Sequence, residues 1–209
     1  MTGKPAPHGS PAEPAGALLE LAEQLRSEET VISPHIVTSA ERPALGLLAG
    51  AGPRAASAPS EYALLVESVH EGYLLHYARP RLLAGHDPDL ALLAGDYLYA
   101  RGIERLSALG DADAVRELSE LISLAAQCHS ERRPEIAAPL WLATAIAIGC
   151  GAGVEHEAGK AAARRLDPGA AELLWEGARL GAASTGLEGD LDRAAESIDF
   201  PPRRADASG

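Results

Sequence analysis

Two carboxylates near the C-terminal end of the chain have the spacing of a metal-binding pair. Glu188 and Asp192 stand four residues apart in the stretch LEGDLD, so on a helix they share a face. Carboxylate oxygens are ligands that Mg²⁺ accepts. The alternative is that they are negative charges in the first turn of a helix, where the helix dipole favours them. We favour the alternative, because a single carboxylate pair cannot hold a cluster of metal ions.

The histidines and cysteines do not form a recognisable metal or nucleophile motif. His70 and His76 are six residues apart and flank Glu71, so they do not share a helix face as ligands four residues apart would. We interpret them as histidines of the core or its rim. Cys128 and Cys150 lack the paired spacing of a zinc site and are too few for a disulfide framework. We therefore expect a reduced, cytoplasmic chain without a bound metal.

Composition excludes several other classes of protein. The 209-residue chain has a net charge of −12, and its 16 Arg and 2 Lys are scattered, so it lacks the concentrated positive face of a nucleic-acid binder. The N-terminal stretch has no apolar segment typical of a signal peptide. The apolar run over 136–154 is broken by Pro and Gly and is too short to span a membrane. Aromatic residues make up only 4%, which favours a core of close-packed helices.

Apolar residues recur at helical spacing over most of the chain. The pattern predicts helices over about 15–26, 60–79, 88–109, 113–127, 135–148, 155–166, 170–183 and 188–198. Asp87-Pro88 and Gly110 have the chemistry of the start and end of the third of these, and Gly72 is expected to allow close helix approach. Residues 30–41 are β-branched and predict a short extended segment. The sequence therefore predicts an all-α helical bundle.

The chain divides into four parts on this interpretation. Residues 1–14 are rich in Pro, Gly and Ser and form a disordered tail. Residues 15–59 contain a first helix, whose apolar face is expected to pack on the bundle, and a flexible linker over 49–60. Residues 60–199 form the bundle, and 200–209 form a second disordered tail.

Four stretches of the predicted bundle resemble motifs of trans-isoprenyl diphosphate synthases, in the order that the family has them. They are 67–83, 90–122, 142–153 and 174–192, with ALLAGDYLYARG the strongest. The matching positions are Leu75, His76, Gly95, Asp96, Leu98, Ala100, Thr144, Ala145, Gly177, Leu180, Gly181 and Ala183. The resemblance implies a shortened isoprenoid-synthase fold and an isoprenoid ligand.

The same stretches depart from the family where metal and diphosphate are bound. Tyr77 and Ala78 stand where the resemblance calls for two aspartates, and Ala143 replaces a lysine. Glu188 and Asp192 are what remains of the second aspartate motif. Without these ligands the charge of a departing diphosphate is not neutralised, and each 1.4 kcal/mol of lost stabilisation slows a reaction tenfold. Ordinary prenyl transfer is therefore not expected.

The resemblance nevertheless implies candidate site residues. The resemblance implies that Arg79 and Arg81 correspond to the arginines after the first motif, and that Tyr77, Asp96 and Thr144 line the substrate site. Asp96 is either a retained functional carboxylate or, as we prefer, a buried or half-buried residue bonded to Tyr99 or a neighbouring helix. We predict a non-catalytic partner, regulator or isoprenoid binder, as a homodimer or a heterodimer with a full-length prenyl synthase.

Two alternatives remain open at this point. One is a divergent prenyltransferase that uses Asp96, Arg79 and Arg81 on an allylic diphosphate, with Mg²⁺ at Glu188 and Asp192. The other is a helical protein-interaction module whose likeness to the family is accidental.

Overall fold

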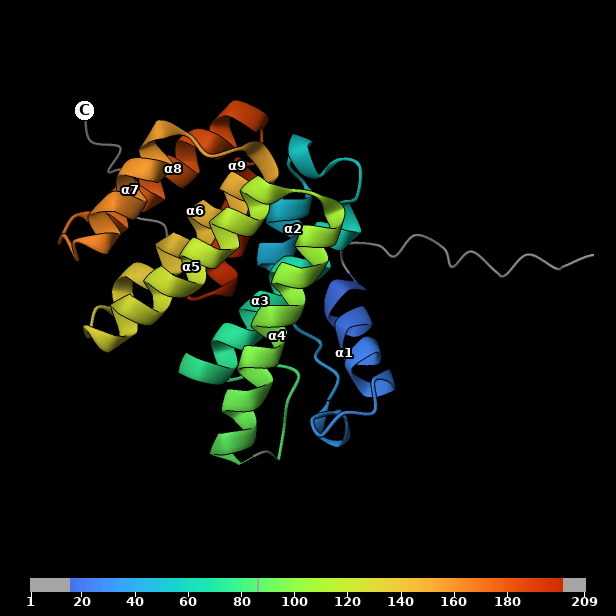
Figure 1. Cartoon of the computed structure of the whole chain (residues 1–209). Helices are drawn as coiled ribbons and strands as arrows, with labels where there is room; N and C mark the ends of the chain where they lie inside the picture. Colours follow the sequence, from blue (N-terminus) through green and yellow to red (C-terminus); the bar gives the residue numbers. More distant parts are fainter. Residues whose placement is uncertain (1–15, 86, 201–209) are drawn as a thin grey trace, which may run out of the picture.

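The computed structural model describes residues 16–85 and 87–200, and in these residues the regular secondary structure is helical (Figure 1). The helices are α1 (Ala17–Ser27), α2 (Ala44–Gly50), α3 (Pro59–Tyr77), α4 (Pro88–Leu109), α5 (Ala112–Ser130), α6 (Ala137–Cys150), α7 (Val154–Arg164), α8 (Ala170–Thr185) and α9 (Glu188–Ser197). Short 3₁₀ turns are η2 (Ser33–His35), η3 (Pro53–Ala55) and η4 (Pro134–Ile136). The predicted all-α class is confirmed. The predicted tail over 1–14, and 201–209 of the second tail, lie outside the described residues.

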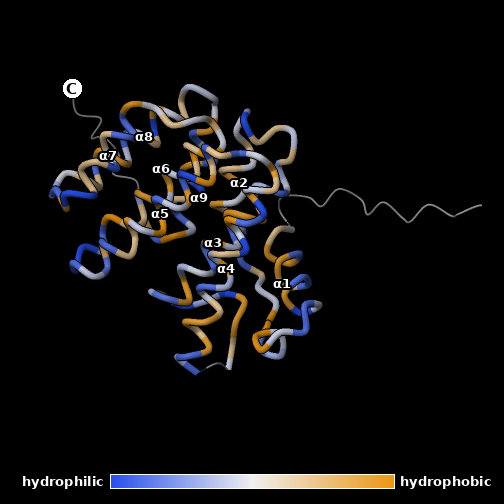
Figure 2. The backbone as a smooth tube through the Cα atoms, viewed as in Figure 1, coloured by the Kyte–Doolittle hydropathy of each residue, from blue (hydrophilic) through white to orange (hydrophobic). Residues whose placement is uncertain are grey.

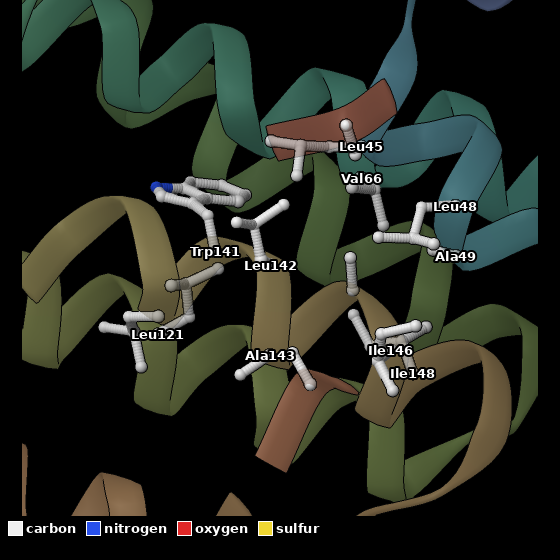
Figure 3. Packing of buried hydrophobic residues seen from close by; sticks show 14 of the residues in the cluster. Leu45, Leu48, Ala49, Val66, Leu121, Trp141, Leu142, Ala143, Ile146 and Ile148 are labelled. Carbon is white, nitrogen blue, oxygen red and sulfur yellow. The ribbon is translucent and has the colours of Figure 1, made fainter. Parts of the chain in front are cut away.

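Helix α6 is the centre of the larger hydrophobic core. Its sequence AAPLWLATAIAIGC carries no charge, so it is stable only where it is covered on all sides, and α2, α5 and α8 pack around it. Figure 3 shows Trp141 and Leu142 of α6 facing Leu45 of α2 and Val66 of α3. Across the described residues, no helix combines the length and apolarity that a membrane span requires.

A second, smaller core joins α1 to α3 and the first half of α4. Leu18, Leu21 and Leu25 of α1 are almost completely buried in it, which confirms that the apolar face of the first helix packs on the bundle. In Figure 1, α1 lies on the opposite side of the molecule from α7 and α8. Hydrophilic stretches gather at outlying turns, such as the one after α5 (Figure 2).

Helices α3 and α4 approach each other closely because glycines stand at their crossing. A Cβ atom on Gly72 would lie 3.0 Å from the backbone oxygen of Gly95, so a larger residue would push the helices apart. The expected ends of α4 are confirmed: Asp87 accepts a hydrogen bond from the Leu90 amide at 2.7 Å, and Gly110 has the left-handed backbone of a helix C-cap.

The segment expected to be a flexible linker is packed instead. Residues 49–60 contain the end of α2, η3 and the start of α3, and Ala49 and Ala55 are completely buried. The glycines that suggested flexibility are contact residues, because a Cβ on Gly52 would lie 2.2 Å from the backbone of Gly149. The segment over 30–41 is extended only in part, where Ile36 forms an isolated antiparallel bridge with Leu83.

Candidate functional site

Tyr77 and Asp96 lie on the outer side of α3 and α4. Tyr77 is the last residue of α3, is 38% exposed and stacks on the His129 ring with centroids 4.1 Å apart. The Asp96 side chain is 76% exposed, and its carboxylate lies 3.3 Å from Nε2 of His76. The expectation that Asp96 is buried or half-buried is wrong, because its position on α4 faces solvent, although it does contact the neighbouring helix.

The other predicted substrate and metal residues lie elsewhere. Thr144 is buried in the middle of α6. Glu188 is the first residue of α9, and both it and Asp192 are exposed. Among the described residues, this pair has no third histidine, cysteine or carboxylate within the reach of a shared metal ion.

Arg79 and Arg81 follow the end of α3 and line the same cavity. Arg79 is exposed, whereas the Arg81 side chain is only 7% exposed and sits between two buried carboxylates. Its Nη1 lies 2.7 Å from Oε2 of Glu67, an ion pair without hydrogen-bond alignment. Its Nε donates a hydrogen bond to Oε2 of Glu71 at 3.0 Å.

Both carboxylates also accept backbone hydrogen bonds, so they hold separate segments together. The amide of Gly46 in α2 donates to Oε1 of Glu67 at 2.8 Å, and the amides of Arg81 and Leu82 donate to Oε1 of Glu71, each at 2.7 Å. Burial raises the pKa of Glu67, but Arg81, His70 and the Gly46 amide outweigh it and lower the pKa to about 2. Glu67 is therefore ionised at neutral pH. We call Glu67, His70, Glu71 and Arg81 the Arg81 cluster.

A cavity of about 620 Å³ lies beside the Arg81 cluster, within the usual size range of small-molecule sites. Aromatic rings form part of its wall: the centroid of Trp141 lies 4.8 Å from that of His70 and 5.5 Å from that of Tyr73. The remaining lining comes from α2, α3, η4, α6 and the end of α9. It comprises Glu41, Arg42, Ala44, Leu45, Glu67, Leu74, Ala78, Arg79, Arg81, Pro134, Ala137, Ala138, Ser197, Ile198 and Asp199.

Several buried polar atoms of this lining have no hydrogen-bond partner within the described part of the chain. They include Nη2 of Arg81 and Nε1 of Trp141, and Figure 3 shows the Trp141 nitrogen on the side of the ring away from Leu142. Nδ1 of His70 lies 3.8 Å from Glu67, too far for a hydrogen bond. Burial, together with Arg81, lowers the pKa of His70 despite the nearby carboxylates, so this ring is neutral at pH 7.

A second buried group of charges lies between α5 and α7, and we call it the Lys160 cluster. Lys160 is 1% exposed, and its Nζ lies within 3.0 Å of Glu117, Glu120 and Glu157. Glu117 also bonds Nε2 of His156 at 2.7 Å. Ligand atoms of Glu117, His156 and Glu157 lie close enough together to hold a metal ion, but the ammonium of Lys160 already supplies the positive charge between the carboxylates.

Comparison with known protein families, with curated proteins and with solved structures found no match to this chain. The function is therefore inferred from the chemistry of the site itself, since a fold alone does not specify one.

The cavity brings together only two of the predicted site residues, Arg79 and Arg81. Its described lining contains none of Tyr77, Asp96, Thr144, Glu188 and Asp192.

Glu67 and Trp141 are residues of this site that no sequence motif predicts. Glu67 could have been noticed, because it directly follows the apolar run Tyr62–Val66, and a charge within a buried stretch needs a buried partner. The single Trp in the uncharged run of α6 is a comparable signal, because a buried indole N–H requires an acceptor.

Proposed function

We propose that this protein is a non-catalytic binding protein for a small amphiphilic molecule, with isoprenoids as the ligand class to test first. The observation that carries the proposal is the cavity, in which aromatic and aliphatic side chains lie beside the buried, unpaired donors of Arg81 and Trp141. Binding sites for small molecules combine a largely apolar wall with a few placed polar groups in this way.

The positions of the carboxylates support a binding role over a catalytic one. Metal-assisted ionisation of a diphosphate needs several oxygen ligands around each cation. Asp96 instead pairs with His76 at the surface, and Glu188 and Asp192 are exposed on α9. The carboxylate in the cavity wall that is most buried, Glu67, is already paired with Arg81.

The isoprenoid class comes from the sequence resemblance, and two observations agree with it. Arg79 and Arg81, which that resemblance places in the substrate site, both line the cavity. Leu45, Leu74 and Ile198 offer an apolar surface for a hydrocarbon chain in the same wall. The expected homodimer, or heterodimer with a full-length prenyl synthase, stays a prediction that size-exclusion chromatography with light scattering can test.

Binding can be measured with the protein's own tryptophan. Trp175 lies outside the cavity lining, so in Trp175→Phe the remaining Trp141 reports events in the cavity. We expect saturable changes of its fluorescence with farnesol and geranylgeraniol, and none with glycerol. Ala138→Phe, which fills the cavity, should abolish the change, and Ala158→Phe on the exposed side of α7 should not. No response to either isoprenoid would overturn the proposal.

A separate assay tests the absence of catalysis. The protein is incubated with dimethylallyl, geranyl or farnesyl diphosphate, isopentenyl diphosphate and Mg²⁺, and we expect no condensed product. Product that forms with the wild type and disappears in Asp96→Ala would establish the prenyltransferase alternative instead.

A further inference from the structure

The head group of the ligand can be inferred from the buried polar atoms of the cavity-lining residues that lack a hydrogen-bond partner, an inference that rests on the proposed function. Nη2 of Arg81 and Nε1 of Trp141 are both N–H donors, both are buried and neither has a partner among the described residues. An unpaired buried donor is costly in free energy. A ligand oxygen that accepts hydrogen bonds would satisfy both donors, so the head group carries an acceptor oxygen. Oε2 of Glu67 also lacks a hydrogen-bond partner among the described residues, and the O–H of a hydroxyl could donate to it.

The charge of the Arg81 cluster decides which acceptor fits. One guanidinium lies between two buried carboxylates, with Glu67 at 2.7 Å and Glu71 at 3.0 Å, and the His70 ring beside them is buried. Glu67 is ionised, and the cluster sets one guanidinium against two carboxyl groups. The positive charge of Arg81 is therefore balanced by carboxyl groups of the protein and does not neutralise a negatively charged ligand.

The mouth of the cavity does not change this balance. Arg42 and Arg79 are exposed in the lining, and so are Glu41 and Asp199, which makes two positive and two negative groups. A diphosphate would bring several negative charges close to Glu67 without a matching cation, and buried charges without partners are strongly unfavourable.

We infer that the protein binds an amphiphile whose head group is an uncharged oxygen acceptor, a carbonyl or a hydroxyl. Its oxygen accepts hydrogen bonds from Nη2 of Arg81 and Nε1 of Trp141. Its hydrocarbon part lies against Tyr73, Leu45 and Leu74, which line the same cavity. This ligand differs from the substrates of prenyl synthases, which carry a diphosphate.

Four probes with the same hydrocarbon chain isolate the head group: farnesol, farnesal, farnesoic acid and farnesyl diphosphate. Their dissociation constants are measured with the full chain by isothermal titration calorimetry without added metal. We expect farnesol or farnesal to bind at least about tenfold more tightly than farnesyl diphosphate. We also expect the affinity of the uncharged probe to be the same in low and high salt, because an uncharged group has no Coulomb attraction to screen.

Trp141→Phe tests the donor directly, because it keeps an aromatic ring and removes the N–H. We expect it to weaken binding of the tighter uncharged probe about fivefold, the effect of one hydrogen bond, with Trp175→Phe as the unchanged control. Tighter binding of farnesyl diphosphate, or an unchanged affinity in Trp141→Phe, would overturn the head-group assignment alone. If none of the four probes binds, the proposed function fails and this inference with it. The four probes are compared on the wild-type protein, so the head-group assignment is tested even if Trp141→Phe does not fold.

Discussion

The Arg81 cluster and the Lys160 cluster are built from the same kinds of residue. Each has a buried base, a buried histidine and at least one buried carboxylate: Glu67 and Glu71 in the Arg81 cluster, and Glu117 in the Lys160 cluster. In the Lys160 cluster, Nζ of Lys160 lies within 3.0 Å of three different carboxylates. In the Arg81 cluster, the guanidinium contacts two carboxylates and its Nη2 has no partner among the described residues.

The charge balance of the two clusters also differs. Arg116 lies 3.3 Å from Glu117, and Arg164 lies 3.1 Å from Glu120, so with Lys160 three basic groups face three carboxylates. The Arg81 cluster has one basic group for two carboxylates. Among the described residues, the Lys160 cluster leaves one buried atom without a hydrogen bond, Nδ1 of His156. The cavity wall leaves four: Nη2 of Arg81, Nε1 of Trp141, Nδ1 of His70 and Oε2 of Glu67.

The difference separates a group of charges that holds helices together from one that we propose to meet a ligand. A fully paired buried network rigidifies a fold, and incomplete pairing is unfavourable unless something else completes it. The Lys160 cluster joins α5 to α7 through side chains alone. The Arg81 cluster joins α2 to α3 and to the segment after α3, and it also borders the cavity.

The largest effect is expected from removing the base of the Arg81 cluster. Arg81→Met leaves Glu67 and Glu71 buried without a cation, so we expect the free energy of unfolding to fall by about 3–5 kcal/mol. Urea denaturation followed by circular dichroism measures the change. Arg79→Met, at an exposed position, is the control and should change stability by less than about 0.5 kcal/mol. Similar losses in both variants would contradict the pairing described for Arg81.

Removing the base of the Lys160 cluster should cost less. In Lys160→Met, Glu117 keeps His156 at 2.7 Å and Arg116 at 3.3 Å, so we expect a loss of about 2 kcal/mol. Arg164→Met, which removes a half-exposed base from the same cluster, is the matched control. If Lys160→Met lowered the free energy of unfolding more than Arg81→Met, the base of the Lys160 cluster would contribute more to stability than Arg81, contrary to this prediction.

Acid should destabilise the protein through both clusters. Arg81, His70 and the Gly46 amide overcome burial and lower the pKa of Glu67 to about 2, and His156 and Lys160 do the same for Glu117. A carboxylate with a lowered pKa stabilises the fold above its unfolded pKa of about 4.5, and this contribution is lost as the pH falls towards 2. Urea denaturation between pH 7 and 3 measures the free energy of unfolding. We expect it to fall less with decreasing pH in Glu67→Gln and in Glu117→Gln than in the wild type. If the free energy of unfolding depended on pH in both variants as it does in the wild type, the pairings of Glu67 and Glu117 would be contradicted.

Among the buried side chains of the two clusters and the cavity wall, the smallest change in stability is expected at Trp141. Because its N–H has no partner among the described residues, Trp141→Phe removes an unpaired donor, and we expect the free energy of unfolding to change by less than about 1.5 kcal/mol. Trp175→Phe is the control for the loss of ring volume. A loss as large as that of Arg81→Met would mean that the indole N–H is bonded in the folded protein.

Helical patterning was enough to predict the class of fold and the packing positions. The apolar faces of α1 and α5, the caps of α4 at Asp87 and Gly110, and the close approach at Gly72 each follow from local residue types and spacing. The packing of 49–60 could not be predicted in this way. In the sequence, a glycine that permits flexibility looks the same as a glycine that permits close contact between two backbones. The two cases are distinguished only by whether another backbone segment packs against the glycine in the folded protein.

The candidate site was less predictable than the fold. Arg79 and Arg81 were proposed from the resemblance, and both line the cavity. That Arg81 would be neutralised by Glu67 and Glu71 depends on the turn after α3, which brings residue 81 back along its own helix. The exposed position of Asp96 depends on which side of α4 faces α3. The ion pairs of Arg81 and the exposure of Asp96 both depend on tertiary packing, which residue spacing in the sequence does not specify.

We propose that the cavity beside the Arg81 cluster binds an amphiphile through the indole N–H of Trp141. The two tryptophans of the chain allow one direct measurement of it. In ¹⁵N-labelled protein each indole N–H gives its own NMR signal, which Trp141→Phe and Trp175→Phe assign. On titration with farnesol, we expect a saturable shift of the Trp141 indole signal and little change in that of Trp175. A Trp141 signal that stays in place at saturating farnesol, or a shift confined to Trp175, would contradict it.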